Sequence, residues 1–93
     1  MSEDWQYSGD WKPRTKGAMK LSEMNGAITA QFSGDNRVHM LNPTGAFLLE
    51  LCNGAHGIDE MVTIVQQAFS LDYLPVKEVK DFLRGSIHEG ILV

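Results

Sequence analysis

The chain has 93 residues, of which 43% are hydrophobic and 22% are charged, and its formal net charge is -4. This length and composition are typical of one small folded domain and argue against wholesale disorder. Eight Lys and Arg stand against twelve Asp and Glu, a balance that disfavours nucleic-acid binding, which normally needs a basic face.

Cysteine content and targeting features give further expectations. Cys52 is the single cysteine, so an internal disulfide is excluded and a cytoplasmic location is expected. The acidic start, Met1-Ser2-Glu3-Asp4, does not resemble a secretory signal. No apolar run approaches the roughly 20 residues that span a bilayer, so no membrane association is expected.

The N-terminal segment differs in composition from the rest of the chain. Residues 1–16 are polar and interrupted by glycine and proline, which predicts a tail that is partly ordered at most. Trp5, Tyr7 and Trp11 lie in this tail, and the sequence allows these rings either to pack on the domain or to stay free. Residues 17–93 are predicted to form the single domain.

Three runs with two-residue alternation follow the tail. The first begins at Met19, the second covers residues 27–32 and the third covers residues 37–41. Asn25-Gly26 favours a tight type I′ hairpin between the first two, because both residues tolerate a positive φ. Turn-forming residues 33–36 separate the second run from the third. The sequence therefore predicts a three-stranded antiparallel meander.

Helical signals occupy the second half of the chain. Asn42 suits a helix N-cap and Pro43 the first helical position, so a helix is expected over residues 43–52. An apolar stripe predicts a second helix over residues 58–69, and Pro75 opens a third that ends near His88. The predicted fold class is α+β, a three-stranded antiparallel sheet followed by three helices. The last two helices are arranged as in a winged helix-turn-helix.

Catalytic and metal-binding patterns are weak. His39, His56 and His88 fall on a strand, in a loop and at a helix end, without the spacing of metal ligands. Cys-x-x-Cys, Gly-x-Ser-x-Gly and His-Glu-x-x-His motifs do not occur. Cys52 lies in an apolar run and is expected to be a buried hydrophobic residue. We therefore expect no enzymatic activity, no metal and no cofactor.

A binding surface is expected where the third strand meets the third helix. The strand would lie at the edge of the sheet with unpaired N–H and C=O groups, to which an extended peptide can add as a further strand. The expected contact residues are Arg37, Val38, His39, Met40 and Leu41 from the strand and Val76, Lys77, Lys80, Leu83, Arg84 and Ile87 from the helix. The cations among them could attract acidic groups of the peptide. The alternative is that these hydrophobic helix residues are ordinary core and the cations its solvated margin.

Several segments resemble one known family. Residues 37–46, Arg-Val-His-Met-Leu-Asn-Pro-Thr-Gly-Ala, and residues 48–54, Leu-Leu-Glu-Leu-Cys-Asn-Gly, resemble the signature of PqqD-like proteins. The segments Val79-x-x-Phe82-Leu83, Gly90-Ile91-Leu92 and Trp11-Lys12-Pro13-Arg14 are similar to other parts of that family. The resemblance spans about residues 11–93.

The resemblance implies a RiPP recognition element, a winged-helix module that binds the leader region of a ribosomally made precursor peptide. Such a module presents the peptide to a modifying enzyme, for example a radical SAM enzyme or a cyclodehydratase. The resemblance also implies that the leader docks as an extra strand on the third strand, against the third helix.

Two other functions fit the same elements. A winged-helix DNA-binding regulator has the same helix order, although Glu78 and Asp81 would then lie in its recognition helix and the net charge is unfavourable. A structural subunit could use the free strand edge to form a homodimer.

Overall fold

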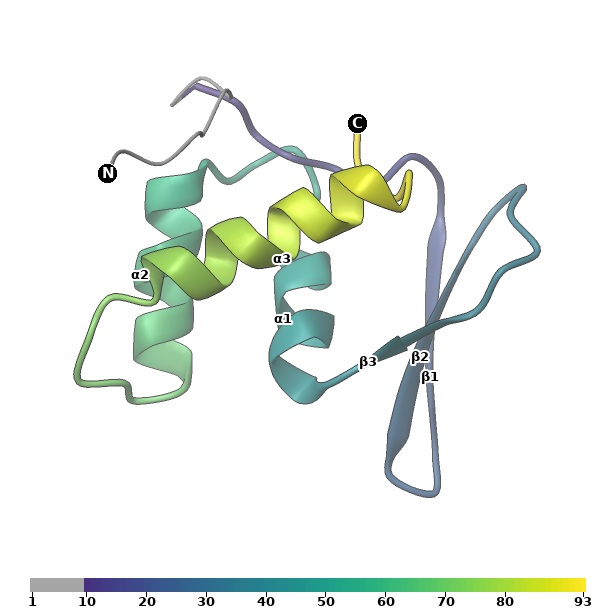
Figure 1. Cartoon of the computed structure of the whole chain (residues 1–93), viewed down its shortest axis with the longest axis horizontal. Coiled ribbons are helices and arrows are strands. Elements are labelled where there is room, and N and C mark those ends of the chain that lie inside the picture. Colours follow the sequence, from purple (N-terminus) through teal and green to yellow (C-terminus); the bar gives the residue numbers. More distant parts are fainter. Residues whose placement is uncertain (1–9) are drawn as a thin grey trace.

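The fold is α+β, as expected. A computed structural model describes residues 10–93. The strands β1 (Met19–Met24), β2 (Ala27–Phe32) and β3 (His39–Leu41) precede the helices α1 (Pro43–Leu51), α2 (Ile58–Ala68) and α3 (Val76–His88). The strands form one antiparallel sheet in the order β1-β2-β3, and the helices pack beside it (Figure 1). The predicted order of three strands and three helices is confirmed.

The β1–β2 hairpin follows from its turn residues and its alternation. Asn25 and Gly26 have φ values of 54° and 82°, the positive values that a type I′ turn requires. Ala30 and Phe32 are buried on the face of β2 that meets the helices, whereas Gln31 between them is exposed. The inner face of the sheet is therefore apolar and buried, whereas the outer face is exposed.

The third strand is shorter than the expected residues 37–41, because Arg37 is held by other partners. The Asp35 carboxylate accepts hydrogen bonds from the Arg37 backbone N–H at 3.0 Å and from its guanidinium at 2.9 Å. Arg37 Nη2 also donates to the Glu89 carbonyl at 2.8 Å. Arg37 thus lies in a turn that faces the end of α3, and strand pairing begins at His39.

The helix ends follow from their capping residues. Asn42 Oδ1 accepts a hydrogen bond from the Gly45 N–H at 2.7 Å, and Pro43 is the first residue of α1. Pro75 caps α3. These observations confirm the expected N-terminus of α1 and the expected start of α3 within one residue.

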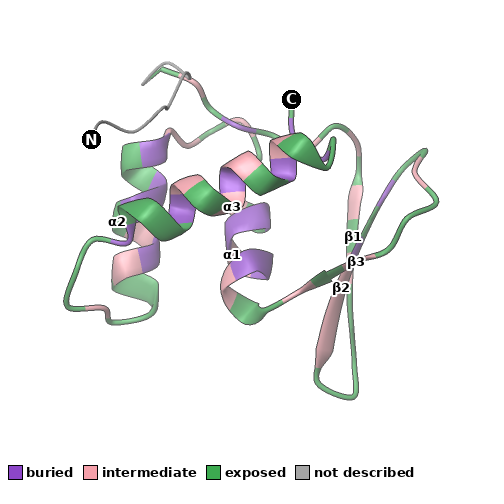
Figure 2. Cartoon of the chain, viewed as in Figure 1, coloured by how far each residue is buried: buried purple, intermediate pink, exposed green. Residues whose placement is uncertain are grey.

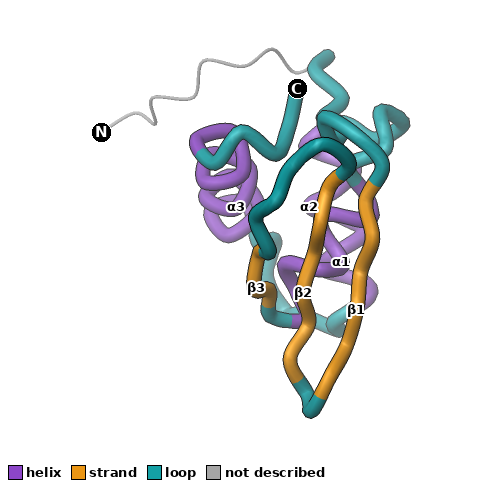
Figure 3. Tube along the Cα trace, turned by 90° about the vertical axis from the view of Figure 1, so that its right-hand side faces the viewer, coloured by secondary structure: helices purple, strands orange, loops and turns teal. Residues whose placement is uncertain are grey.

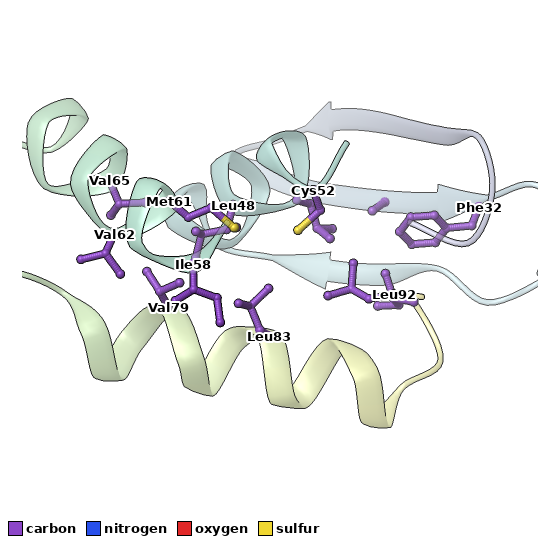
Figure 4. Packing of buried hydrophobic residues seen from close by; sticks show 13 residues of the cluster. Phe32, Leu48, Cys52, Ile58, Met61, Val62, Val65, Val79, Leu83 and Leu92 are labelled. Carbon is purple, nitrogen blue, oxygen red and sulfur yellow. The ribbon is translucent and has the colours of Figure 1, made fainter. Parts of the chain in front are cut away.

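The core lies between the three helices and the inner face of the sheet. Figure 2 shows that each of the three helices carries buried residues. Figure 4 shows Val79 and Leu83 of α3 pointing toward Leu48 of α1 and toward Ile58 and Met61 of α2. These five side chains are buried and belong to one hydrophobic cluster. Leu83 is therefore a core residue, one of the two alternatives that the sequence left open.

Part of the segment assigned to the N-terminal tail is bound to the domain. The Thr15 N–H donates to the Cys52 carbonyl at 3.2 Å, and the Lys16 N–H donates to the Ile91 carbonyl at 2.8 Å. Trp11 packs against the core. This segment therefore ties the end of α1 to the C-terminal residues. The expectations for Trp5 and Tyr7 lie outside the described residues.

Candidate functional site

A groove separates β3 from the C-terminal half of α3. Its volume is about 480 Å³, and Figure 3 shows β3 between β2 and α3. The residues that line it come from β3 and the residue before it, from α3, and from the segment after α3. They are Val38, His39, Met40, Leu41, Asp81, Phe82, Gly85, Ser86, His88, Glu89 and Ile91. The groove is large enough for several peptide side chains.

The outer edge of β3 offers a free peptide group at Met40. The Ser33 N–H donates to the Ala18 carbonyl at 2.9 Å, so residues 27, 29 and 31 of β2 direct their backbone groups toward β1. Backbone groups alternate in direction along a strand, so residues 28 and 30 bond to their β3 partners, Leu41 and His39. The N–H and C=O of Met40 consequently point away from β2, toward the free edge.

The side chains of the strand divide between the groove surface and the core. Val38 and Met40 are exposed, Met40 by 70%. His39 is half-buried, and its ring meets the edge of Phe32 with ring centroids 5.7 Å apart. The His39 Nε2 atom is buried without a hydrogen-bond partner. His39 therefore forms part of the groove's inner wall, and its Nε2 is not available to a ligand.

The helix residues expected to form the groove wall lie elsewhere on α3. Leu83 is fully buried in the core and Ile87 packs against it. The groove lining also does not include Val76, Lys77, Lys80 or Arg84. These six expected contacts are thus not part of the groove lining, and their contact with a peptide stays a prediction.

The turn of the helix explains why these six residues do not line the groove. Successive residues of an α-helix are rotated by about 100°, and Val79 and Leu83 define the face of α3 that meets the core. The strand lies on the side of this stripe that carries Phe82 and Gly85. Apolar periodicity identifies the buried face of a helix, but it does not indicate on which side of that face a distant strand packs.

Gly85 leaves open space on the helix wall. It lines the groove, and a Cβ added to it would meet no atom within 4 Å apart from its own neighbours and the helix backbone. Glycine inside a helix costs about 0.5–1 kcal/mol relative to alanine. Gly85 was not predicted as a groove residue, although a glycine inside a predicted helix is a signal that a side chain could be unfavourable there.

The charged groups around the groove are mostly paired with one another. Arg37 bonds to Asp35 and lies 3.6 Å from the Glu89 carboxylate, which joins the turn before β3 to the end of α3. The hydrogen bond from the Arg37 side chain is the main reason why the pKa of Asp35 is held well below its usual range.

Asp81 is paired along the helix. It bonds to Lys77 at 2.7 Å and to Arg84 at 3.2 Å, and the hydrogen bond from Lys77 lowers its pKa. Lys77 and Arg84 therefore neutralise an acidic residue of the wall. This arrangement does not support the expectation that they attract acidic groups of a peptide into the groove.

The single thiol of the described part of the chain is buried. Burial raises the pKa of the Cys52 thiol to about 12, so Cys52 is a poor nucleophile. Within residues 10–93, no three His, Cys, Asp or Glu side chains are close enough to hold a metal ion. The helices found in that range are too short or too polar to cross a membrane.

Comparison with known proteins identifies a family. The family model described as Coenzyme PQQ synthesis protein D (PqqD) matches residues 16–92. Comparisons with curated proteins and with solved structures gave no match. The matched range includes every element of the sheet and the helices, and it includes both walls of the groove. The chain therefore belongs to the PqqD family.

Proposed function

We propose that the chain binds the leader region of a ribosomally synthesised precursor peptide in the groove between β3 and α3, and that it presents this peptide to a modifying enzyme. Membership of the PqqD family supports a role in the biosynthesis of PQQ or of another peptide-derived product. The observation that carries the proposal is the free peptide group of Met40 at the edge of a groove whose walls are mostly, though not entirely, apolar.

Strand addition explains how such a groove would hold a peptide. The leader would lie beside β3, pair with the N–H and C=O of Met40, and direct alternate side chains toward Phe82, Gly85 and Ile91. Because β3 has only three residues, main-chain pairing is limited and the side chains in the groove supply much of the selectivity. A small interface of this kind gives an affinity of order micromolar, about -8 kcal/mol.

The proposed contribution to the chemistry is indirect. An adaptor that holds the precursor and the enzyme together raises the effective concentration of the precursor at the active site. The partners are then a leader peptide and a peptide-modifying enzyme such as a radical SAM enzyme or a cyclodehydratase. This role needs no catalytic group on the chain itself.

The two alternative functions have less support. For DNA binding, α3 would enter the major groove, yet it carries Glu78 and Asp81 and is followed by Glu89. For homodimerisation, two copies would pair through the same edge of β3, so a second copy would compete with the peptide. The mass in solution with and without leader peptide separates a dimer from a monomeric adaptor.

The experiment that tests the proposal is an amide NMR titration with the leader half of the precursor peptide encoded beside this protein. Saturable shifts at residues 38–41 and 81–91 are expected, with little change in α2. A peptide of the same composition in scrambled order is the control. A folded spectrum without shifts at several hundred micromolar leader would contradict the proposal.

A further inference from the structure

A second hollow lies at the opposite end of α3 from the groove. It is enclosed by the start of α1, the end of α2, the connecting loop and the first turn of α3. Its volume is about 170 Å³. We call it the α2–α3 hollow, and it is lined by Thr44, Leu48, Val65, Phe69, Leu71, Tyr73, Pro75, Glu78 and Val79.

The walls of the α2–α3 hollow are apolar and held in place. Leu48, Val65 and Val79 are buried core residues that form its floor. Phe69 packs edge-on against Phe47 with ring centroids 5.6 Å apart. The Tyr73 hydroxyl donates to Glu78 Oε2 at 3.3 Å. The hollow is therefore a formed feature of the surface, and it does not require a loop to move before something can enter.

Exposed apolar side chains gather around this hollow. Tyr73 is 49% exposed and Leu74 is 58% exposed, and Phe69 and Val76 are also exposed. Figure 2 shows this loop as largely exposed. Half of the eight large hydrophobic residues exposed in the described part of the chain thus lie between residues 69 and 76. Concentrated apolar surface of this kind marks contact sites with other proteins.

The rim of the α2–α3 hollow is acidic. The negative charge of Glu78, with a smaller contribution from Asp72, raises the pKa of Tyr73. The nearby cation Lys77 bonds instead to Asp81 at 2.7 Å, and the described residues that line the hollow include no Lys or Arg. The rim therefore favours a positively charged group beside whatever fills the hollow.

The size of the hollow restricts its occupant. Sites for small molecules and cofactors are usually about 300–1,000 Å³, so a hollow of 170 Å³ accommodates about one large side chain. A single apolar anchor in such a pocket is typical of protein–protein contacts. We propose that the α2–α3 hollow is a docking site for a second protein, which inserts one apolar side chain flanked by lysine or arginine.

This docking site leaves the groove free. The two sites share no lining residue, and Glu78 and Gly85 are about 10 Å apart along the helix axis. An adaptor that brings a peptide to an enzyme needs two separate surfaces. The α2–α3 hollow supplies the second surface, and the modifying enzyme is the protein that would bind there. The binding chemistry itself does not depend on the proposed leader function.

The experiment uses two short probes with the full chain. N-acetyl-Lys-Phe-Lys-amide and N-acetyl-Glu-Phe-Glu-amide carry the same ring with opposite flanking charges. The cationic probe is expected to give saturable amide shifts at Leu71, Tyr73 and Val79 with a millimolar dissociation constant. Exposed ion pairs contribute about 0.2–1 kcal/mol each, so the acidic probe should bind about fivefold more weakly, and added salt should reduce this difference.

Two charge-reversing variants complete the test. Glu78→Lys should invert the preference between the two probes, whereas Glu23→Lys makes the same change on exposed β1 and should leave the preference intact. The proposal is overturned if neither probe gives shifts at these residues, or if both bind equally and Glu78→Lys has no effect. It is also overturned if these amides shift on dilution without probe, since a second copy of the chain would then be the occupant.

Discussion

Gly85→Leu is expected to stabilise the domain and to block the groove at the same time. Gly85 lies inside α3 on the face toward β3, and a Cβ at this position meets no atom within 4 Å apart from its own neighbours and the helix backbone. Leucine has a helix propensity close to that of alanine, well above that of glycine. The substitution therefore removes a helix penalty at a position with room for the new side chain.

The two effects have opposite signs. Gly85→Leu and Gly85→Ala should each raise the free energy of unfolding by about 0.5–1 kcal/mol, a rise in Tm of about 2–8 °C for a domain of this size. Leucine, unlike alanine, also projects into the groove. If it displaces one large apolar side chain of the leader, the lost burial is about 1.5–3 kcal/mol. Leader affinity would then fall by about 10- to 150-fold.

The assay pairs thermal unfolding with a binding measurement. Circular dichroism gives the Tm of each variant, and fluorescence anisotropy with a labelled leader half gives its dissociation constant. Gly85→Ala is the matched control, with a raised Tm and nearly unchanged affinity. A Gly85→Leu chain that is more stable yet binds leader as tightly as the unsubstituted chain would refute the placement of the leader against this face of α3.

Three further predictions concern residues outside the groove opening. Leu83→Asp places a carboxylate in the core, so the free energy of unfolding measured by urea titration is expected to fall by more than about 3 kcal/mol. A variant as stable as the unsubstituted chain would contradict the burial of Leu83. Because Arg37 lowers the pKa of Asp35, the stability that Asp35 contributes is complete above its ordinary pKa of 3.8 and is lost as the pH falls below it. The difference in urea midpoint between the unsubstituted chain and Asp35→Asn should therefore stay constant from about pH 7 to 5 and shrink from about pH 4 to 2; a difference that grows on acidification would count against this ion pair. Burial raises the pKa of the Cys52 thiol to about 12, so a thiol reagent at about pH 8 should label the chain quickly only in urea, and rapid labelling of the folded chain would show that Cys52 is accessible.

Local signals in the sequence predicted most of the fold. The Asn25-Gly26 turn, the Asn42 cap, Pro43 at the start of α1 and Pro75 before α3 each act through neighbouring residues. Their effects can therefore be worked out from residue type and position alone. The strand side of the groove was also predictable, since Met40 and its neighbours form the edge of a three-stranded meander.

Features that depend on distant contacts were not predictable in the same way. Arg37 leaves the strand because its guanidinium binds the Glu89 carbonyl, 52 residues away. Thr15 and Lys16 join the domain through Cys52 and Ile91. Phe82 and Gly85 line the helix wall of the groove because of how α3 is placed against β3. The apolar periodicity of α3 contains no information about that placement.

The measurement that tests strand addition most directly is residue-resolved amide hydrogen exchange with and without the leader half. The Met40 N–H points to the free edge, whereas the N–H groups of His39 and Leu41 already bond to β2. Exchange at Met40 should therefore slow strongly when leader saturates the chain, and exchange at His39 and Leu41 should change little. Unchanged exchange at Met40, with leader demonstrably bound, would contradict the proposed pairing on β3.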